Sequence, residues 1–269
     1  MFASLRFALH EYVNNRKLLF KLAYIHMSQA TVRSTWGVVW VYIHDILYFT
    51  AFTLFRILLT GNRGVEGMNS VEYLMTGLVP WLIISEVLNS ATNAIRNNKV
   101  IIQSIRFPIT ILPGVEVLAI LLKRLPTFLF IVIVCTYYGH IHLFHPLLFL
   151  YYLLCIVVML FALTVLFSGL IAVSEDFHQV YMAVMRVLFF TLPIMWDFKA
   201  FAGSSFESWA NILKINPLIY IVEGFRDAFL LGQVPSMRYT IYFWVLTFLI
   251  LWLGCFVQRR LQKFYSDFI

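Results

Sequence analysis

The stretch PLLFLYYLLCIVVMLFALTVLFSGLIAVS, residues 146–174, decides the fold of this chain. It contains no lysine, arginine, aspartate or glutamate. A helix needs about 20 apolar residues to cross the hydrocarbon core of a bilayer, so this segment is long enough to span a membrane. A second stretch, Tyr239–Gln258, is equally free of charged residues. We therefore predict a membrane-spanning helix at each of these two places.

The composition of the whole 269-residue chain agrees with this interpretation. Hydrophobic residues make up 61%, charged residues only 12%, and the mean hydropathy is +0.84. A typical soluble domain contains about 25% charged residues, which is twice the share found here. Soluble globular, disordered and fibrous proteins are therefore excluded in favour of an integral membrane protein. The aromatic share of 17% fits lipid-facing and interfacial positions.

Four further apolar segments are long enough to span a bilayer, although charged residues or prolines interrupt them. They are residues 36–59, 71–95, 109–138 and 178–196. The alternation typical of an outer-membrane β-barrel is not the pattern here. We therefore predict an all-α membrane protein with six transmembrane helices.

Lysine and arginine indicate how these helices are oriented. Most lie before the first span, between spans two and three, and after span six: Arg6, Arg16, Lys17, Lys21, Arg33, Arg96, Lys99, Arg106, Arg259, Arg260 and Lys263. The short loops that would lie opposite, residues 60–70 and 139–145, carry only Arg63. Because lysine and arginine concentrate in cytoplasmic loops, we predict that both termini are cytoplasmic.

Residues 1–30 precede the first span and have a different pattern. Leu5, Leu9 and Tyr12 fall near helical spacing, with basic residues such as Arg6 and Lys17 between them. This pattern predicts an amphipathic interface helix lying on the cytoplasmic leaflet. A solvated tail is the alternative. Residues 31–269 then form the six-span domain.

The segment between spans five and six, residues 200–234, is too apolar for an ordinary solvated loop. Asn216-Pro217 and the glycines Gly224 and Gly232 interrupt it. Two short helices that re-enter the outer leaflet explain this pattern, provided that their backbone packs on protein or lines a wet cavity. A surface-lying amphipathic hairpin is the alternative.

Motifs for catalysis or for binding nucleotides are missing from the sequence. There is no GxxxxGK[ST] loop to hold ATP, and no HExxH, GxSxG or GxGxxG. Cys135, Cys155 and Cys255 lie in apolar runs and are interpreted as small buried hydrophobes. The cluster His140-x-His142-x-x-His145 is interpreted as a solvated turn rather than a metal site. We therefore expect no catalytic residue, no metal ligand, no cofactor and no nucleic acid on this chain.

Several charged residues lie inside predicted spans, where each is costly unless it faces protein or water. Glu116 and Lys123 share one helix face, with Arg124 beside it. Either this part of span three extends out of the membrane, or the face lines a polar path. For Glu86 and Arg186, a buried structural pair and contact with a charged substrate both remain open.

Residues 96–108 join spans two and three and include the run NNKVIIQSIRF. Its isoleucines and valine, interleaved with Lys99 and Arg106, predict a short cytoplasmic amphipathic helix. A short helix with an exposed apolar side favours docking on a partner. Packing beneath the bundle is the alternative.

Five motifs, in order along the chain, resemble those of the permease subunits of polysaccharide-export ABC transporters. They are STWGVVW at 34–40, GLVPW at 77–81, SATNAI at 90–95 followed by Asn97-Asn98 and Phe107-Pro108, Glu175-Asp176 with RVLFF at 186–190 and PIMW at 193–196, and Asn216-Pro217 with EGFRD at 223–227. One such motif is weakly specific, whereas five in order over most of the chain are fairly specific. Within the family, the chain most resembles the wall teichoic acid exporter permease.

The resemblance implies the fold of ABC type-2 exporters and a bacterial cytoplasmic membrane location. It also implies a homodimer of this permease, surrounded by membrane lipids and bound to two copies of a separate ATPase that holds ATP and magnesium. The missing ATP-binding loop agrees independently with such a division. The cargo would be an undecaprenyl-diphosphate-linked polymer, which would pass between the two permease copies.

The resemblance also implies roles for particular residues. The coupling helix that contacts the ATPase would contain Asn97, Asn98, Lys99, Ile101, Ile102, Ile105, Arg106 and Phe107. The interface helix would admit the substrate headgroup, for which Lys17, Lys21 and Arg33 could supply charge-assisted hydrogen bonds. The channel would be lined by Trp81, Phe189, Phe190 and Trp196. The external gate would contain Trp209, Asn216, Pro217, Tyr220 and Arg226. Packing or lipid contact is the alternative for the aromatic residues, and lipid-headgroup binding for the basic ones.

Other functions remain as alternatives at this point. An O-antigen or capsular polysaccharide permease is the nearest one, and a small-molecule drug exporter of the ABC class is another. A membrane-embedded enzyme acting on lipid-linked glycans would need a polar pair such as His44-Asp45. Adjacent residues point to different faces of a helix, which weakens the hypothesis of such an enzyme.

Overall fold

The computed structural model describes residues 2–32, 36–37, 39–60, 69–98, 108–198, 203 and 207–261. Within these ranges every regular element is a helix and no strand occurs, which confirms the predicted all-α class. The elements are α1 (Phe2–Asn14), α2 (Arg16–Val32), α3 (Val39–Thr60), α4 (Ser70–Ala91), α5 (Ala94–Asn97), α7 (Leu112–Arg124), α8 (Phe128–Tyr137), α9 (Pro146–Val173), α10 (Glu175–Thr191), α11 (Glu207–Leu213), α12 (Pro217–Arg226) and α13 (Met237–Leu261). Short helical turns cover Ile109–Ile111, Leu125–Thr127, Ile141–Leu143 and Asp227–Leu231.

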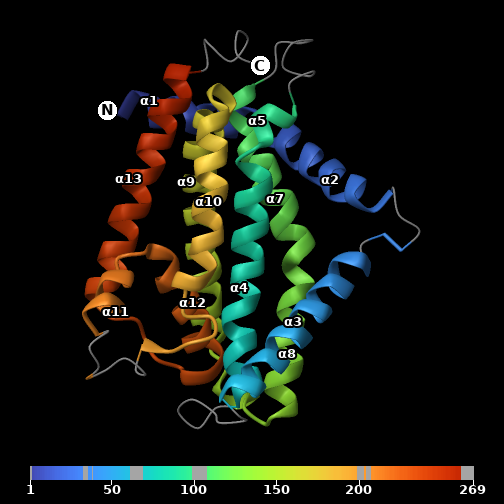
Figure 1. The fold of residues 1–269 in the computed structure, drawn as a ribbon. Coiled ribbons are helices and arrows are strands. Elements are labelled where there is room, and N and C mark those ends of the chain that lie inside the picture. Colours follow the sequence, from blue (N-terminus) through green and yellow to red (C-terminus); the bar gives the residue numbers. More distant parts are fainter. Residues whose placement is uncertain are drawn as a thin grey trace.

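Figure 1 shows the long helices side by side, with α4 between its neighbours α7 and α10. Helices α1, α2 and α5 lie at one end of this bundle, where α13 also ends. Helices α11 and α12 lie at the opposite end, and α3 crosses obliquely along one side. The residues predicted as one interface helix form two, α1 and α2.

Four helical stretches in the described ranges are long and apolar enough to cross a membrane. They are Ser70–Ala91, Ile109–Tyr137, Pro146–Val173 and Met237–Leu261. They correspond to predicted spans two, three, four and six. The first and fifth spans correspond to α3, which carries Asp45 and Arg56, and to α10, which has 17 residues. Those two spans, and therefore the count of six, stay predictions.

Local sequence explains where several helices begin and bend. Asn69 caps α4 by accepting a hydrogen bond from the Val71 amide at 2.9 Å, while Glu72 accepts one from the Asn69 amide at 3.2 Å. Pro126 lacks the backbone N–H for an α-helical hydrogen bond, and around it the third predicted span changes through a tight turn, Leu125–Thr127, from α7 into α8. Asn216 and Pro217 start α12 in the positions that a cap and a first-turn proline favour.

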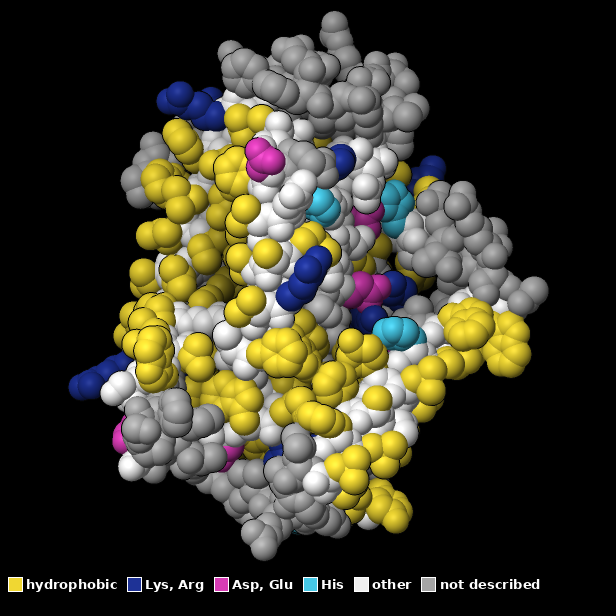
Figure 2. All heavy atoms as spheres, in the orientation of Figure 1, with side chains coloured by type: hydrophobic (Ala, Val, Ile, Leu, Met, Phe, Trp, Pro, Cys, Tyr) yellow, Lys and Arg dark blue, Asp and Glu magenta, His cyan; other side chains and the backbone are white. Residues whose placement is uncertain are grey.

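The core is centred on α4 rather than on the most apolar helix. In its most apolar window, 83% of α4 is buried, against 56% for α9, which has the highest mean hydropathy, and 22% for α13. Helix α13 packs along α9, where a Cβ on Gly254 would lie 2.9 Å from the Leu166 backbone nitrogen. Figure 2 shows hydrophobic side chains covering much of the face between the two ends. Such a surface fits a bilayer and not water.

Candidate functional site

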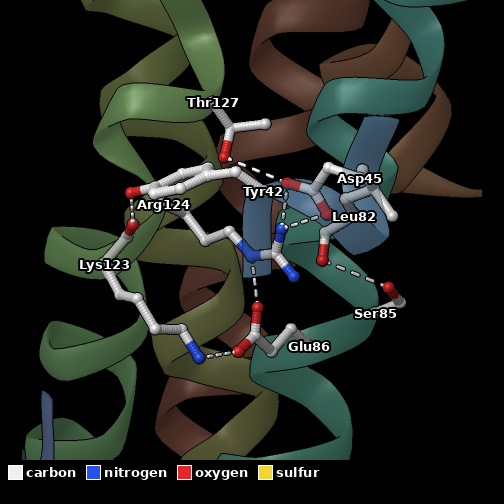
Figure 3. A network of polar contacts seen from close by, with 8 residues as sticks. All are labelled: Tyr42, Asp45, Leu82, Ser85, Glu86, Lys123, Arg124 and Thr127. Atoms are coloured by element: carbon white, nitrogen blue, oxygen red, sulfur yellow. Dashed lines mark hydrogen bonds and ion pairs between the residues drawn. The ribbon is translucent and has the colours of Figure 1, made fainter. Parts of the chain in front are cut away.

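Four charged residues form an ionic cluster between α3, α4 and α7, in which Asp45 and Arg124 are buried and Glu86 and Lys123 are partly buried (Figure 3). Arg124 donates from Nη1 to both carboxylate oxygens of Asp45, at 2.6 and 2.5 Å. Glu86 receives Arg124 Nε on one oxygen and Lys123 Nζ on the other. Asp45 is fully buried. Buried charges persist only when each has a good partner, and here two anions face two cations.

The ionic cluster gives protein partners to three of the charged residues that the sequence left open. Glu86 pairs with Lys123 and Arg124, and Asp45 joins Arg124 from a third helix, α3. His44 stacks on Tyr48 with ring centroids 5.3 Å apart, so it does not join Asp45 in a catalytic pair. Arg186 is exposed on α10 and makes no ion pair with any residue that the structure describes.

A second buried group, the carbonyl clamp, consists of Arg56, Tyr73 and Arg226. Arg56 Nη1 donates to the carbonyl oxygen of Met195 at 2.6 Å, and Arg226 Nη2 donates to that of Pro193 at 2.8 Å. The Tyr73 hydroxyl donates to the carbonyl of Trp196 at 2.9 Å. Both guanidinium groups lie over the Tyr73 ring, 4.6 and 3.7 Å from its centroid. The clamp therefore fixes the backbone of residues 193–196, just after α10.

Arg226 was predicted at the external gate. The structure places it at the C-terminal end of α12, where only 5% of the residue is exposed. Its position is tight, because a Cβ on Gly77 of α4 would lie 3.0 Å from Arg226 Nη2. Gly77 belongs to the GLVPW motif and Pro193 to the PIMW motif. Two motifs that are far apart in the sequence thus meet at one arginine.

The other predicted gate residues are distributed over α11 and α12. Trp209 on α11 is 67% exposed. Asn216 accepts a hydrogen bond from the Leu218 amide at 3.0 Å and caps α12, with Pro217 in its first turn. The Tyr220 hydroxyl lies 2.9 Å from that of Tyr151 on α9. These contacts join α12 to the bundle and leave α11 outside it.

The predicted channel aromatics lie along α4 and α10. Trp81 is buried and packs on Phe189, which also contacts Phe52 of α3, with centroids 5.4 and 5.3 Å apart. Phe190 is 74% exposed and adjoins Phe189. Trp196 donates from Nε1 to the Phe190 carbonyl at 3.2 Å. Trp81 and Phe189 therefore pack on each other, the Trp196 ring packs on Phe198, and Phe190 is largely exposed.

The predicted headgroup residues Lys17 and Lys21 are exposed on α2, whereas Arg33 lies outside the described residues. Helix α2 packs along α7, and His26 Nδ1 lies 2.8 Å from Glu116 Oε1. This hydrogen bond to Glu116 raises the pKa of His26. Helix α1 is tied to the same region, because the Tyr12 hydroxyl donates to the Thr110 carbonyl at 2.7 Å.

The predicted coupling helix is described only at its start. Asn97 and Asn98 end α5 and, with Glu86, Glu116 and Lys123, line a cavity of about 370 Å³. The remaining residues predicted for coupling lie outside the described residues: Lys99, Ile101, Ile102, Ile105, Arg106 and Phe107. The same holds for parts of the 200–234 segment.

The histidines near the α8–α9 turn have separate partners. His140 Nδ1 lies 2.8 Å from Glu72 Oε2, and His142 Nδ1 lies 2.9 Å from the Gly139 carbonyl oxygen. His145 packs against Gly232. No group of three potential metal ligands occurs among the residues that the structure describes.

Sequence reasoning did not assign roles to Arg56, Tyr73 or His26. Arg56 could have been noticed, because a charge inside an apolar span must find a partner or water. Nothing in the pattern around Tyr73 distinguishes it from the other aromatic residues of the chain. His26 lies 90 positions from Glu116, so only the packing of α2 on α7 shows the pair.

Comparison with known proteins places these features in context. No family model matches the chain. The chain is similar to the O-antigen export system permease protein RfbA of Myxococcus xanthus, with 20% identity over 251 residues. The match covers 93% of this chain and 94% of that protein. The similarity therefore runs from end to end and is not confined to one motif.

Proposed function

We propose that the chain is the membrane-spanning permease subunit of an ATP-driven exporter of a cell-surface polysaccharide. The end-to-end similarity to an O-antigen export permease carries this proposal. The four apolar helices support a membrane location, and the absence of an ATP-binding loop from the sequence supports a separate ATPase.

The proposed cargo is an O-antigen-like polysaccharide on a polyprenyl diphosphate lipid, which the family resemblance implies to be undecaprenyl diphosphate. The similarity to an O-antigen export permease favours O-antigen as the cargo, and no observation favours wall teichoic acid. A diphosphate and a hydroxyl-rich polymer cannot cross hydrocarbon without a polar path, because each unpaired polar group costs free energy there.

We propose that two copies of the chain enclose that path and that α10 faces it. Arg186 is exposed on α10 beside apolar residues such as Val187 and Phe190, which are 61% and 74% exposed. An arginine that faces lipid is costly, whereas one that faces water or a second protein copy is not. This placement makes Arg186 a path residue, in contrast to the structural charges of the ionic cluster.

The end that carries α1, α2 and α5 is proposed to face the cytoplasm and to receive the ATPase (Figure 1). The lysines and arginines predicted to be cytoplasmic belong to the segments at or next to this end. Residues 96–108 would seat in the ATPase, Lys17 and Lys21 would meet the lipid headgroup, and α11 and α12 would lie at the outer surface.

Co-purification with the ATPase tests this proposal. The permease would be expressed with the ATPase encoded beside it and isolated in nanodiscs, and the amount of bound ATPase would be measured. Ile102→Asp places a charge on the apolar side predicted to dock, so we expect ATPase recovery to fall about tenfold or more. Ile212→Asp, at an exposed position on α11, is the matched control and should retain the ATPase. Full retention by Ile102→Asp would contradict the assigned coupling segment.

A further inference from the structure

A cavity of about 290 Å³ lies between α9, α12 and the beginning of α13, at the end of the bundle opposite α1 and α2. Its walls combine four tyrosines with three carboxylates, a lysine and an asparagine. Ligand sites usually begin at about 300 Å³, so the volume suits a small ligand with a single ring. Three residues predicted for the external gate, Asn216, Pro217 and Tyr220, line this cavity, but no ligand has been assigned to it.

Tyr152 is a buried wall residue whose hydroxyl has no hydrogen-bond partner among the described residues. Only 1% of the residue is exposed, and no described residue forms a hydrogen bond with its hydroxyl. Its ring is held tightly, because a Cβ on Gly224 of α12 would lie 1.9 Å from the ring. The hydroxyl is not one of the fully enclosed polar atoms without a partner, so it borders space that water or a ligand can reach. It can donate one hydrogen bond there.

Two other tyrosines of the wall differ from Tyr152, because their hydroxyl groups have hydrogen-bond partners. The Tyr220 hydroxyl is engaged by the hydroxyls of Tyr151 and Thr240, at 2.9 and 3.0 Å. The Tyr242 hydroxyl donates to the Ile215 carbonyl at 2.6 Å. These two residues build the wall, whereas Tyr152 keeps its donor free.

Glu223 and Lys214 are further wall residues with unused polar groups. The Glu223 carboxylate forms no hydrogen bond or ion pair with a described residue, and burial raises its pKa. The Lys214 ammonium lies 4.9 Å from the centroid of the Phe198 ring and forms no ion pair with a described residue. The wall therefore offers a hydroxyl, a carboxyl and an ammonium beside aromatic rings.

This combination restricts the ligand. A phosphate would meet three carboxylates and only one lysine, which disfavours it electrostatically. A lipid tail would leave the polar groups unpaired. A ring that has apolar C–H faces and several hydroxyl groups can pack on tyrosines and pair the free donors and acceptors at the same time.

We propose that this cavity binds one pyranose ring of a glycan, with Tyr152 and Glu223 as its hydrogen-bonding residues. Its position at the outer surface rests on the proposed function, whereas the sugar chemistry rests on the cavity itself. The ring could belong to the exported polymer or to a free sugar, since both present the same groups.

Saturation-transfer NMR on the full-length permease in nanodiscs tests this site. The probes are the methyl pyranosides of glucose, galactose, mannose and N-acetylglucosamine. We expect transfer to the ring protons of at least one of them. Tyr152→Phe and Glu223→Gln should each weaken that binding about fivefold, because each removes one hydrogen-bonding group. Tyr137→Phe, at an 82% exposed tyrosine of α8, is the matched control and should bind normally.

The possible outcomes separate the interpretations. Displacement of the bound glycoside by the cell's own purified surface polysaccharide would support the site and identify the polymer as its source. A glycoside that stays bound would support a site for free sugars. Absence of transfer from all four probes, or binding that neither variant weakens, would overturn the proposal. Binding of phosphorylethanolamine with the same dependence on Tyr152 and Glu223, in place of the glycosides, would also overturn it. None of these readouts involves the ATPase, so the proposed transport function is tested separately.

Discussion

The ionic cluster and the carbonyl clamp are both polar groups inside apolar helices, but they are neutralised in different ways. Arg124 in the cluster meets the carboxylates of Asp45 and Glu86. Arg226 in the clamp meets a backbone carbonyl and the face of Tyr73. The cluster thus pairs full charges with full charges, whereas Arg226 of the clamp pairs with a carbonyl dipole and a ring.

The difference indicates what each region holds in place. The ionic cluster joins three helices, α3, α4 and α7, through side chains. The clamp holds the backbone of residues 193–196, which leads out of α10, by contacts from α3, α4 and α12. Helix α3 takes part in both through Asp45 and Arg56, so its oblique position is fixed at two points.

If the two regions differ in this way, loss of Arg124 should have the largest effect on stability. Arg124→Met leaves Asp45 buried without its cation, and breaking a buried pair costs about 3–5 kcal/mol. The measurement is the free energy of unfolding in an SDS titration. The double variant Asp45→Asn/Arg124→Met removes both charges and should lose much less than the sum of the two single losses. Additive losses would contradict an electrostatic cluster.

Loss of Arg226 should have an intermediate effect. Arg226→Met removes the donor to the Pro193 carbonyl and leaves an unpaired carbonyl dipole rather than an unpaired charge. We therefore expect the free energy of unfolding to fall by about 1–3 kcal/mol in the same titration. Arg238→Met, at an exposed arginine at the start of α13, is the matched control and should change little. A loss from Arg226→Met as large as that from Arg124→Met would erase the distinction between the two regions.

The pair His26–Glu116 should show the smallest effect, and a dependence on pH. Its side chains are 21% and 16% exposed, so we expect the pair to contribute less than about 1 kcal/mol. Because the pKa of His26 is raised in the folded state, the contribution is complete below the ordinary histidine pKa and is lost as pH rises through the raised value. Unfolding measured across this range should separate wild type from His26→Gln at acid pH and not at alkaline pH. A constant difference would mean that the pair does not depend on a charged His26.

Sequence reasoning reached the charged residues of the ionic cluster but not their arrangement. The rule that charge inside a span needs a partner selected Glu86, Lys123 and Arg124 correctly as residues to explain. It could not separate a structural pair from a polar path, because Asp45 completes the cluster from a helix 79 positions away. The same rule also selected Arg186. The structure places this residue on the exposed side of α10, which fits the interpretation that it contacts a charged substrate.

The amino-acid sequence by itself determined the all-α class, the long apolar helices and the interruption at Asn216-Pro217. These features follow from composition, periodicity and capping, which act over a few residues. Only the tertiary structure decided which charges pair, which tyrosine keeps a free hydroxyl and which motifs meet at Arg226. Those outcomes depend on contacts between residues far apart in the chain. A local sequence pattern carries no information about which distant side chain will make the contact.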